Sequence, residues 1–315
     1  MPSVRRLTRG LGAAAVALLA AAPTAEAGFV TFAPGPPGST LYDVTYRANA
    51  NEGANDVTVR PGSNFGVVDW HDANYPTTAG PGCTALPDGH VECQRGTNTV
   101  LRLLAGDDRA SVQIGGGRVT VLGGVGNDDV AGTTFGSGAQ VFGEGGDDRV
   151  FAGGDGGALA DGGSGNDDIF CCGGQDGGST VGGSGNDLIR ARSSQPGTVN
   201  SDGGTGNDII LGASGFSTSS AAGGDGNDVI AVHGSSGGFR PRPHNVTAGT
   251  GDDVIFGGSI EGDVIDAGDG RDVIDVSGGG ADSVDCGAGT DVVRFDDTDT
   301  VGADCEIKLA PDGSF

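Results

Sequence analysis

The feature that most constrains the fold is a glycine-rich motif that recurs about every twenty residues along most of the chain. Its intact form, Gly-Gly-x-Gly-Asn-Asp, begins at residues 123, 162, 182, 203 and 223. In intact and degenerate copies, successive closing aspartates lie 19 to 21 residues apart, except for one gap of 25. They are Asp108, Asp128, Asp148, Asp167, Asp187, Asp208, Asp228, Asp253, Asp272 and Asp291. A period of this length indicates stacked supersecondary units instead of one globular core.

Two core positions accompany each motif. A valine or isoleucine stands two residues after each aspartate from Asp128 onward, and a valine, isoleucine or small residue stands seven residues before it. Short β-branched segments between glycine clusters are typical of strands and turns. We therefore predict an all-β fold, a parallel β-roll or β-solenoid of two-strand coils with a period of about 20 residues. Consecutive coils would pair through backbone hydrogen bonds about 4.8 Å apart.

The core of such a solenoid is a thin strip. Burying one Val or Ile contributes about 1.5 to 3 kcal/mol, whereas ordering each residue costs about 1 to 2 kcal/mol. A coil with two or three buried side chains therefore needs a further source of stability. Glycine-rich turns can fold carbonyl oxygens inward, and the closing aspartate adds a carboxylate.

Oxygen-only ligands favour a hard cation. Calcium accepts about six to eight oxygens in flexible geometry, whereas magnesium requires a tighter octahedron. Stacked carboxylates about 4.8 Å apart would repel by about 3 kcal/mol at an effective dielectric constant of about 20. The pattern therefore predicts that several Ca²⁺ ions neutralise the column of aspartates.

These motifs resemble the haemolysin-type calcium-binding repeats of the RTX family, whose nonapeptide is Gly-Gly-x-Gly-x-Asp-x-apolar-x. The resemblance covers about residues 103 to 295. It implies that each turn binds calcium between stacked coils of a parallel β-roll, with the aspartates as ligands. Because the motif occurs once per coil and not in tandem, we expect only one edge to carry calcium.

The match to the family motif varies along the column. The full motif surrounds Asp128, Asp167, Asp187, Asp208 and Asp228. It is weaker at Asp148, Asp253, Asp272 and Asp291, where one paired glycine is replaced by Glu144, Ala248, Ala267 and Cys286 respectively, and it is weakest at Asp108. A metal-free solenoid whose Asp and Asn side chains form hydrogen-bonded ladders is the alternative interpretation of the same column.

Charge and the N-terminal segment point to an exported protein. The formal net charge is −25, which argues against nucleic acid as a partner. Residues 1–27 contain three arginines, an apolar run and small residues before position 28, and are interpreted as a signal peptide. No later apolar run approaches the length of a membrane span, so we predict no membrane insertion and a secreted, extracellular or cell-surface location.

In an exported chain the six cysteines are expected to form disulfides. Cys83 and Cys93 are close enough in sequence for a local bridge. Cys286 and Cys305 are separated by 19 residues, which equals one coil, so they should lie within bonding distance. The adjacent Cys171 and Cys172 could bond to each other, pair elsewhere or stay reduced.

The expected domains follow the repeat. Residues 28–102 form an N-terminal β cap or irregular first coils of the solenoid, with a separate ligand-binding domain as the alternative. Residues 103–305 form the calcium-binding β-roll, and residues 306–315 form a C-terminal tail. The insertion in the longest repeat, residues 233–245, carries two arginines and two histidines; it is either a tolerated insertion or a site for an anionic partner.

The sequence carries no recognisable catalytic motif. None of the four histidines, His71, His90, His233 and His244, begins a His-Glu-x-x-His zinc motif. The stretch GSSGG at 234–238 matches Gly-x-Ser-x-Gly but lacks the strand-to-helix setting of a nucleophile elbow.

The predicted function is therefore a secreted calcium-binding repeat protein, not an enzyme, whose ions act as structural staples of a surface or matrix rod. Its expected partners are calcium ions, together with an unidentified cell-surface or polysaccharide partner. The alternatives are a secreted hydrolase with an unrecognised site on the solenoid, and a calcium-dependent adhesin or ice-binding-like module. Ice binding is disfavoured because the residues between the motif glycines form no regular threonine row.

Overall fold

The computed structural model describes residues 28–34, 42–48, 53–62, 66–94, 96–172, 174, 176–193, 197–214, 219–234, 243–258 and 262–310. The proposed signal peptide lies outside these residues, as does most of the insertion at 233–245. All regular elements in the described part are strands, and none of its segments is a helix that could cross a membrane.

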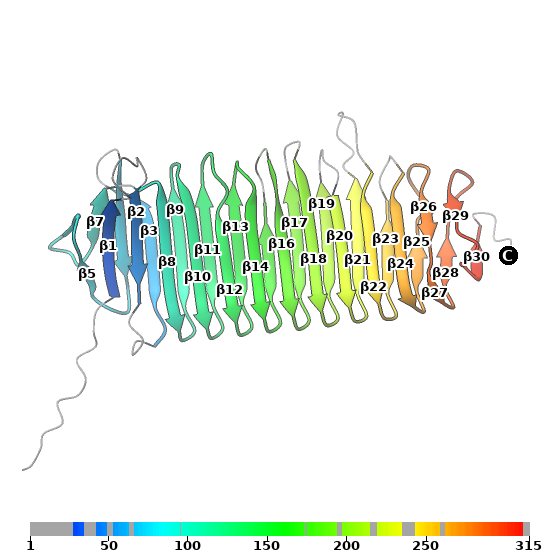
Figure 1. The fold of residues 1–315 in the computed structure, drawn as a ribbon, viewed down its shortest axis with the longest axis horizontal. Helices are drawn as coiled ribbons and strands as arrows, with labels where there is room; N and C mark the ends of the chain where they lie inside the picture. The colour runs from blue at the N-terminus through cyan, green and yellow to red at the C-terminus, as the bar shows by residue number, and fades with distance from the viewer. Residues whose placement is uncertain are drawn as a thin grey trace, which may run out of the picture.

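The strands form a parallel β-solenoid, as predicted (Figure 1). Each coil contributes one strand to each of two sheets, named sheet A and sheet B. The coil strands of sheet A are β2 (Tyr42–Arg47), β8 (Asn98–Ala105), β10 (Arg118–Val125), β12 (Gln140–Gly145), β14 (Ala158–Ser164), β16 (Gly177–Ser184), β18 (Thr198–Thr205), β20 (Ser219–Asp225), β22 (Asn245–Thr250), β24 (Val264–Gly270), β26 (Ser283–Asp285), β27 (Ala288–Gly289) and β29 (Thr300–Val301).

Sheet B runs alongside in the same order. Its coil strands are β3 (Asp56–Pro61), β9 (Arg109–Ile114), β11 (Asp129–Thr134), β13 (Arg149–Gly154), β15 (Asp168–Cys171), β17 (Leu188–Ser193), β19 (Ile209–Ser214), β21 (Val229–Gly234), β23 (Val254–Gly257), β25 (Val273–Asp275), β28 (Val292–Arg294) and β30 (Ile307–Leu309). The last of these, β30, lies within the stretch expected to be a tail and pairs with β28, so the final coil extends to Leu309.

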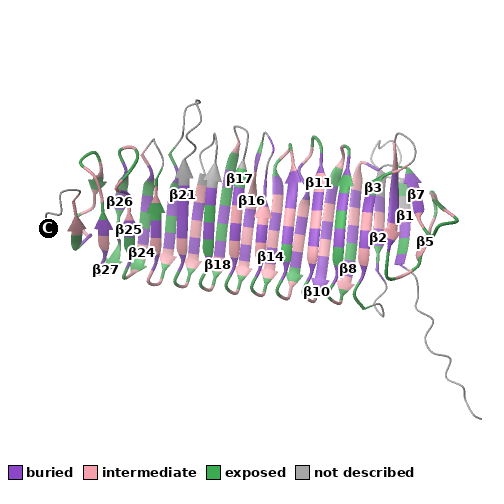
Figure 2. Ribbon diagram, turned by 180° about the vertical axis from the view of Figure 1, so that it is seen from behind, coloured by how far each residue is buried: buried purple, intermediate pink, exposed green. Residues whose placement is uncertain are grey.

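The core is the strip between the sheets, and buried and exposed positions alternate along the strands (Figure 2). The β-branched residues that follow the aspartates stack in register, as Ile169 does on Ile189, and are fully buried. In the middle coils the facing column holds the hydroxyl residues Thr180 and Ser201. These would be costly to bury alone, but the Thr180 hydroxyl donates to the Ser201 hydroxyl at 2.9 Å.

Residues 28–102 contain both coil strands and capping strands. Strands β2 and β3 pair in parallel with β8 and β9, so they form a first regular coil. The remaining strands cap the sheets in antiparallel orientation or at their edges: β1 (Gly28–Pro34), β4 (Val67–Asp72), β5 (Thr77–Ala79), β6 (Cys83–Ala85) and β7 (Val91–Gln94). Buried Tyr46 stacks on Trp70 at a centroid distance of 6.4 Å and donates to Asp72 at 2.8 Å.

The cysteines lie at disulfide distance. Cys83 pairs with Cys93 across the β6–β7 hairpin, and Cys286 pairs with Cys305 one coil away, with Cα atoms 5.2 Å apart. Cys171 and Cys172, left open by the sequence, bond to each other, and the backbone at Cys172 has a positive φ of 83°. The two bridges predicted from spacing are thus present.

Candidate metal column

The ten aspartates singled out in the sequence lie in one continuous column, here called the aspartate column. Each follows the turn that leads from a strand of sheet A into the next strand of sheet B, and each is at most 3% exposed. From Asp128 onward, the Oδ1 atom of each one accepts a hydrogen bond from the backbone N–H of the column residue in the preceding coil. For Asp128 to Asp291 the donor–acceptor distances are 2.7 to 2.9 Å.

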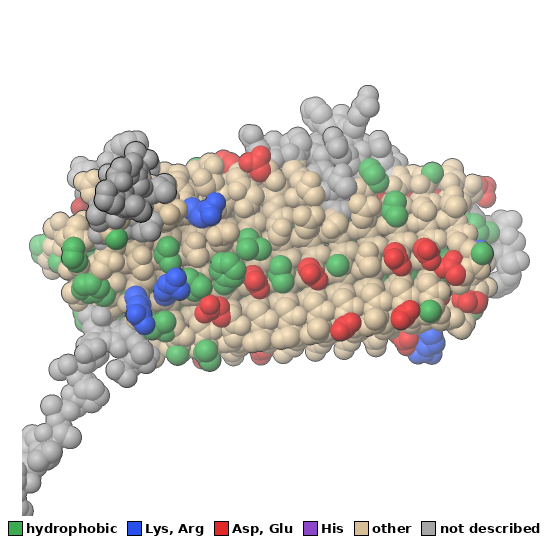
Figure 3. Space-filling model, viewed as in Figure 1, with side chains coloured by type: hydrophobic (Ala, Val, Ile, Leu, Met, Phe, Trp, Pro, Cys, Tyr) green, Lys and Arg blue, Asp and Glu red, His purple; other side chains and the backbone are tan. Residues whose placement is uncertain are grey.

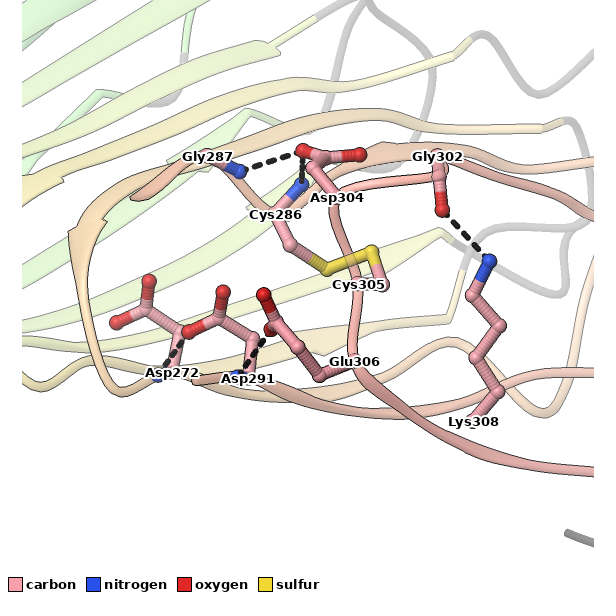
Figure 4. The surroundings of a disulfide bond; sticks show 9 residues. All are labelled: Asp272, Cys286, Gly287, Asp291, Gly302, Asp304, Cys305, Glu306 and Lys308. Carbon is pink, nitrogen blue, oxygen red and sulfur yellow. Dashed lines mark hydrogen bonds between the residues drawn. A yellow bond between two sulfur atoms is a disulfide. The ribbon is translucent and has the colours of Figure 1, made fainter. Parts of the chain in front are cut away.

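The column is closed at both ends by residues that the sequence did not reveal. At the N-terminal end, Asn55 donates its backbone N–H and its side-chain amide to Asp108 Oδ1. At the C-terminal end, Glu306 Oε2 accepts from the backbone N–H of Asp291 at 3.0 Å (Figure 4). Both could have been found by strand register, because each directly precedes a strand, as the column aspartates do.

A second ladder explains why asparagine so often precedes the aspartate. These exposed Asn and Asp side chains bond in the opposite sense, because each Oδ1 accepts from the backbone N–H of the following coil. Asn166 Oδ1, for example, accepts from the N–H of Asn186 at 2.8 Å. The outer ladder consists of Asp107, Asn127, Asp147, Asn166, Asn186, Asn207, Asn227 and Asp252, and it ends at the N–H of Arg271.

The second carboxylate oxygen carries the strongest functional signal. In every residue of the aspartate column, Oδ2 is buried and has no hydrogen-bond partner. In six of the coils it lies against the first paired glycine of its own motif. A Cβ at Gly182, for example, would overlap both Asp187 Oδ2 and the carbonyl oxygen of Gly203. Buried carboxylate oxygens are normally paired or bound to a cation, so this row is anomalous for a cation-free protein.

Burial also alters the acidity of the column. Loss of hydration raises the pKa of Asp148, Asp187 and Asp228 from 3.8 to about 7, and the charges of neighbouring column residues add to this effect. It raises the pKa of Asp128, Asp167 and Asp272 to about 6. The hydrogen bond from the neighbouring N–H acts against these shifts without cancelling them. For these six residues, a proton or a bound cation would offset the cost of burying the charged carboxylate.

The donor set suits a cation that accepts backbone oxygen. Within the described ranges, no three His, Cys, Asp or Glu side chains converge on one point. Each coil brings one buried carboxylate, and the carbonyl oxygen of a motif glycine such as Gly165 faces the Cα of Gly185 in the next coil. An ion between coils would therefore draw most of its ligands from carbonyl groups, which suits calcium better than zinc.

A shorter acidic ladder occupies the opposite edge near the C-terminus, where we expected no such feature. The N–H of His244 donates to Asp263 at 2.9 Å, that of Asp263 to Asp282 at 2.5 Å, and that of Asp282 to Asp299 at 2.9 Å. Asp282 Oδ2 is again buried without a partner, and burial raises the pKa of Asp282 to about 7. Asp263 and Asp282 stand two residues before buried Ile265 and Val284, the same offset as in the main column.

Other sequence candidates do not join these columns. His71 and His90 stack on each other in the N-terminal cap at 4.4 Å, and His90 Nδ1 lies 3.0 Å from Asp69. The GSSGG stretch and the arginines of the insertion fall outside the described residues, apart from Gly234.

The face of the solenoid drawn in Figure 3 carries acidic side chains along most of its length and basic side chains mainly near its N-terminal end.

Comparison of the chain with protein-family models, with curated proteins and with solved structures finds no match.

Proposed function

We propose that this chain is a secreted, non-enzymatic calcium-binding solenoid in which Ca²⁺ ions staple successive coils along the aspartate column. The observation that carries the proposal is the row of buried Oδ2 atoms without hydrogen-bond partners. If the ladder were only structural, aspartate would destabilise the fold relative to asparagine. Oδ1 of either residue can accept the inter-coil hydrogen bond, but only the carboxylate carries a charge that burial disfavours.

The residues that would hold the ions are the ten column aspartates, together with the carbonyl groups of the glycine turns. When bound, calcium supplies positive charge and an oxygen coordination shell. The chain's own contribution is to hold one carboxylate per coil in a fixed rotamer through the Oδ1 hydrogen bond, which leaves Oδ2 without a hydrogen-bond partner. In six coils Oδ2 lies against the first paired glycine, and the missing Cβ there leaves room for the carboxylate.

The shorter ladder through Asp263 and Asp282 belongs to the same proposal. Oδ2 of Asp282 is buried and has no hydrogen-bond partner, like the Oδ2 atoms of the main column. We therefore extend the expected calcium sites to both edges of the C-terminal coils and to one edge elsewhere.

Calcium titration with a matched pair of variants tests the proposal. In calcium-free buffer the protein should be expanded or easily melted, and it should gain β-sheet circular dichroism and thermal stability as calcium rises to about 0.1 to 1 mM. Asp187→Asn retains the Oδ1 acceptor but removes the charge, so it should lower the calcium stoichiometry and the calcium-dependent rise in Tm. Asp266→Asn removes the same charge from an exposed position and should change neither.

Two results would contradict the proposal. One is a Tm and circular dichroism spectrum that are the same in chelator and in saturating calcium. The other is an equal loss of bound calcium in Asp187→Asn and Asp266→Asn, measured by native mass spectrometry. Either result would favour a ladder stabilised by hydrogen bonds and protons alone.

A further inference from the structure

The outer face of sheet B carries a basic and aromatic groove that the calcium proposal does not use. The groove has a volume of about 460 Å³ and crosses strands β9, β11, β13, β15 and β17. A second hollow of about 320 Å³ continues from it toward the ends of the strands, and the two share Phe151. The combined depression lies on the outer face of sheet B. It borders the aspartate column, because four of its lining residues each directly follow a buried column aspartate in the sequence: Arg109, Asp129, Arg149 and Asp168.

Three arginines and two aspartates give the groove a positive balance in a chain of net charge −25. Arg109 lies 3.7 Å from Asp129, and Arg190 contacts Asp168. Arg149 stands between these two pairs in strand register and is exposed. It forms no ion pair with any residue in the described part of the chain, so its guanidinium is available to an anionic ligand.

An aromatic wall stands beside this arginine. The rings of Phe151 and Phe170 are stacked, with centroids 5.4 Å apart and planes 14° apart. In the neighbouring strand β11, the register partner of Phe151 is Ala131. Because alanine has only a methyl side chain, a slot remains above the sheet beside the Phe151 ring. The ring face of Phe151 opposite Phe170 borders this slot, and such a face attracts the polarised C–H edge of a ligand.

We propose that this groove, here called the Arg149 groove, binds an acidic saccharide, with a sugar ring in the slot above Ala131. The C–H face of the sugar would pack on Phe151, its carboxylate would pair with Arg149, and its hydroxyl groups would donate to Asp129. Arginine binds carboxylates in bidentate geometry, and an open groove with ring faces and hydrogen-bonding groups suits a flat polyhydroxylated ring. The flanking aspartates disfavour a densely charged polyanion, since each would repel it.

The test uses a hyaluronan octasaccharide as the acidic probe and its carboxyl-reduced form as the neutral counterpart. Both are titrated into the full mature chain in saturating calcium, with binding followed by calorimetry. We expect saturable binding of the acidic probe and binding weaker by about tenfold for the reduced probe. Arg149→Gln should weaken binding of the acidic probe by about tenfold as well.

A slot-filling variant tests the placement of the ligand. Ala131→Phe extends the existing Phe151–Phe170 stack along the same column, so it should fold normally while closing the slot and abolishing binding. Phe256→Ala is the matched control, because Phe256 is 43% exposed and occupies the same column of sheet B several coils away. Arg102→Gln removes an exposed positive charge from sheet A. Both controls should bind like the wild type.

Three outcomes would overturn the proposal: no saturable binding of the acidic probe, unchanged binding in Arg149→Gln and Ala131→Phe, or equally tight binding of hexaglutamate. The last result would make the groove a general anion site or a peptide site. None of them bears on the calcium column, because calcium is saturating throughout and its effect on Tm is measured separately.

Discussion

The backbone N–H of Asp291 donates a hydrogen bond to Oε2 of Glu306, so a glutamate completes a ladder that is otherwise built from aspartates (Figure 4). The Cys286–Cys305 bridge lies beside this contact and joins the same two coils. The C-terminal end of a solenoid is stacked on one side only and frays most easily. A side-chain cap and a disulfide therefore both stabilise the last coil, which has a neighbour on one side only.

Removing the glutamate cap should loosen the last turn. Glu306→Ala leaves the N–H of Asp291 without its acceptor, and we expect a loss of about 1 kcal/mol in local stability. Hydrogen exchange at the Asp291 amide measures this directly. Glu306→Gln keeps an acceptor oxygen and should stay close to the wild type, whereas unchanged exchange in Glu306→Ala would show that the contact does not stabilise the turn.

Loss of the terminal disulfide should free the last coil. The bridge closes a loop between residues separated by 19 positions, and such a loop contributes about 3 kcal/mol in the chain-entropy account. In Cys305→Ser, exchange should increase first in residues 292–295. Non-reducing peptide mapping of the wild type should link Cys286 to Cys305, and a link from Cys286 to Cys171 or Cys172 would disprove the arrangement.

A glycine series should separate steric overlap from backbone strain. A Cβ at Gly185 would overlap the carbonyl oxygen of Gly165, and φ there is 123°. Gly185→Ala should therefore cost about 3 kcal/mol or more. Gly136 has a φ of 93° but open space around it, so its alanine variant should lose only about 1 kcal/mol.

The reference variant in this series is Gly278→Ala, since Gly278 has neither a positive φ nor a neighbour within 4 Å of the added carbon. Its Tm should match that of the wild type. Equal Tm values for all three variants would mean that the turns do not pack in the close register described here.

Without calcium, stability should decrease as pH rises through neutrality. The folded-state pKa of Asp148, Asp187 and Asp228 is about 7, against an ordinary value of 3.8. Between these values the folded state binds more protons than the unfolded state, so the free energy of unfolding falls with increasing pH. The contribution is full below about pH 4 and is lost above about pH 7.

Thermal melts in calcium-free buffer between about pH 4.5 and 8 measure this slope. Asp187→Asn should reduce it, because one titrating group is removed. Saturating calcium should flatten or reverse it, because the ion binds the deprotonated carboxylate. A Tm that rises steadily with pH in the absence of calcium would contradict the burial of the column in its charged form.

Much of the fold could be read from the sequence because its pattern is local and repeated. The offset of two residues from Asp128 to Val130 places a carboxylate in the turn and a β-branched side chain in the core, and the same offset recurs in each coil. The separation of 19 residues between Cys286 and Cys305 equals one coil, which was enough to predict their proximity. A repeating unit needs only its period for its neighbours to be known.

The tertiary structure decided what depends on distances between coils and on the direction of each side chain. It determined that Oδ1 of Asp187 accepts a hydrogen bond whereas Oδ2 has no partner, and that Asn55 and Glu306 close the column. It also revealed the shorter ladder through Asp263 and Asp282 on the other edge. It also stacked Phe151 on Phe170 and placed Ala131 on the other side of Phe151. The sequence by itself determined the period, the sheets and the aspartate column, because these follow from a short motif that recurs at a nearly fixed spacing. The unpaired oxygens and the groove depend on atoms about twenty residues apart, whose approach is fixed only when the coils stack in register.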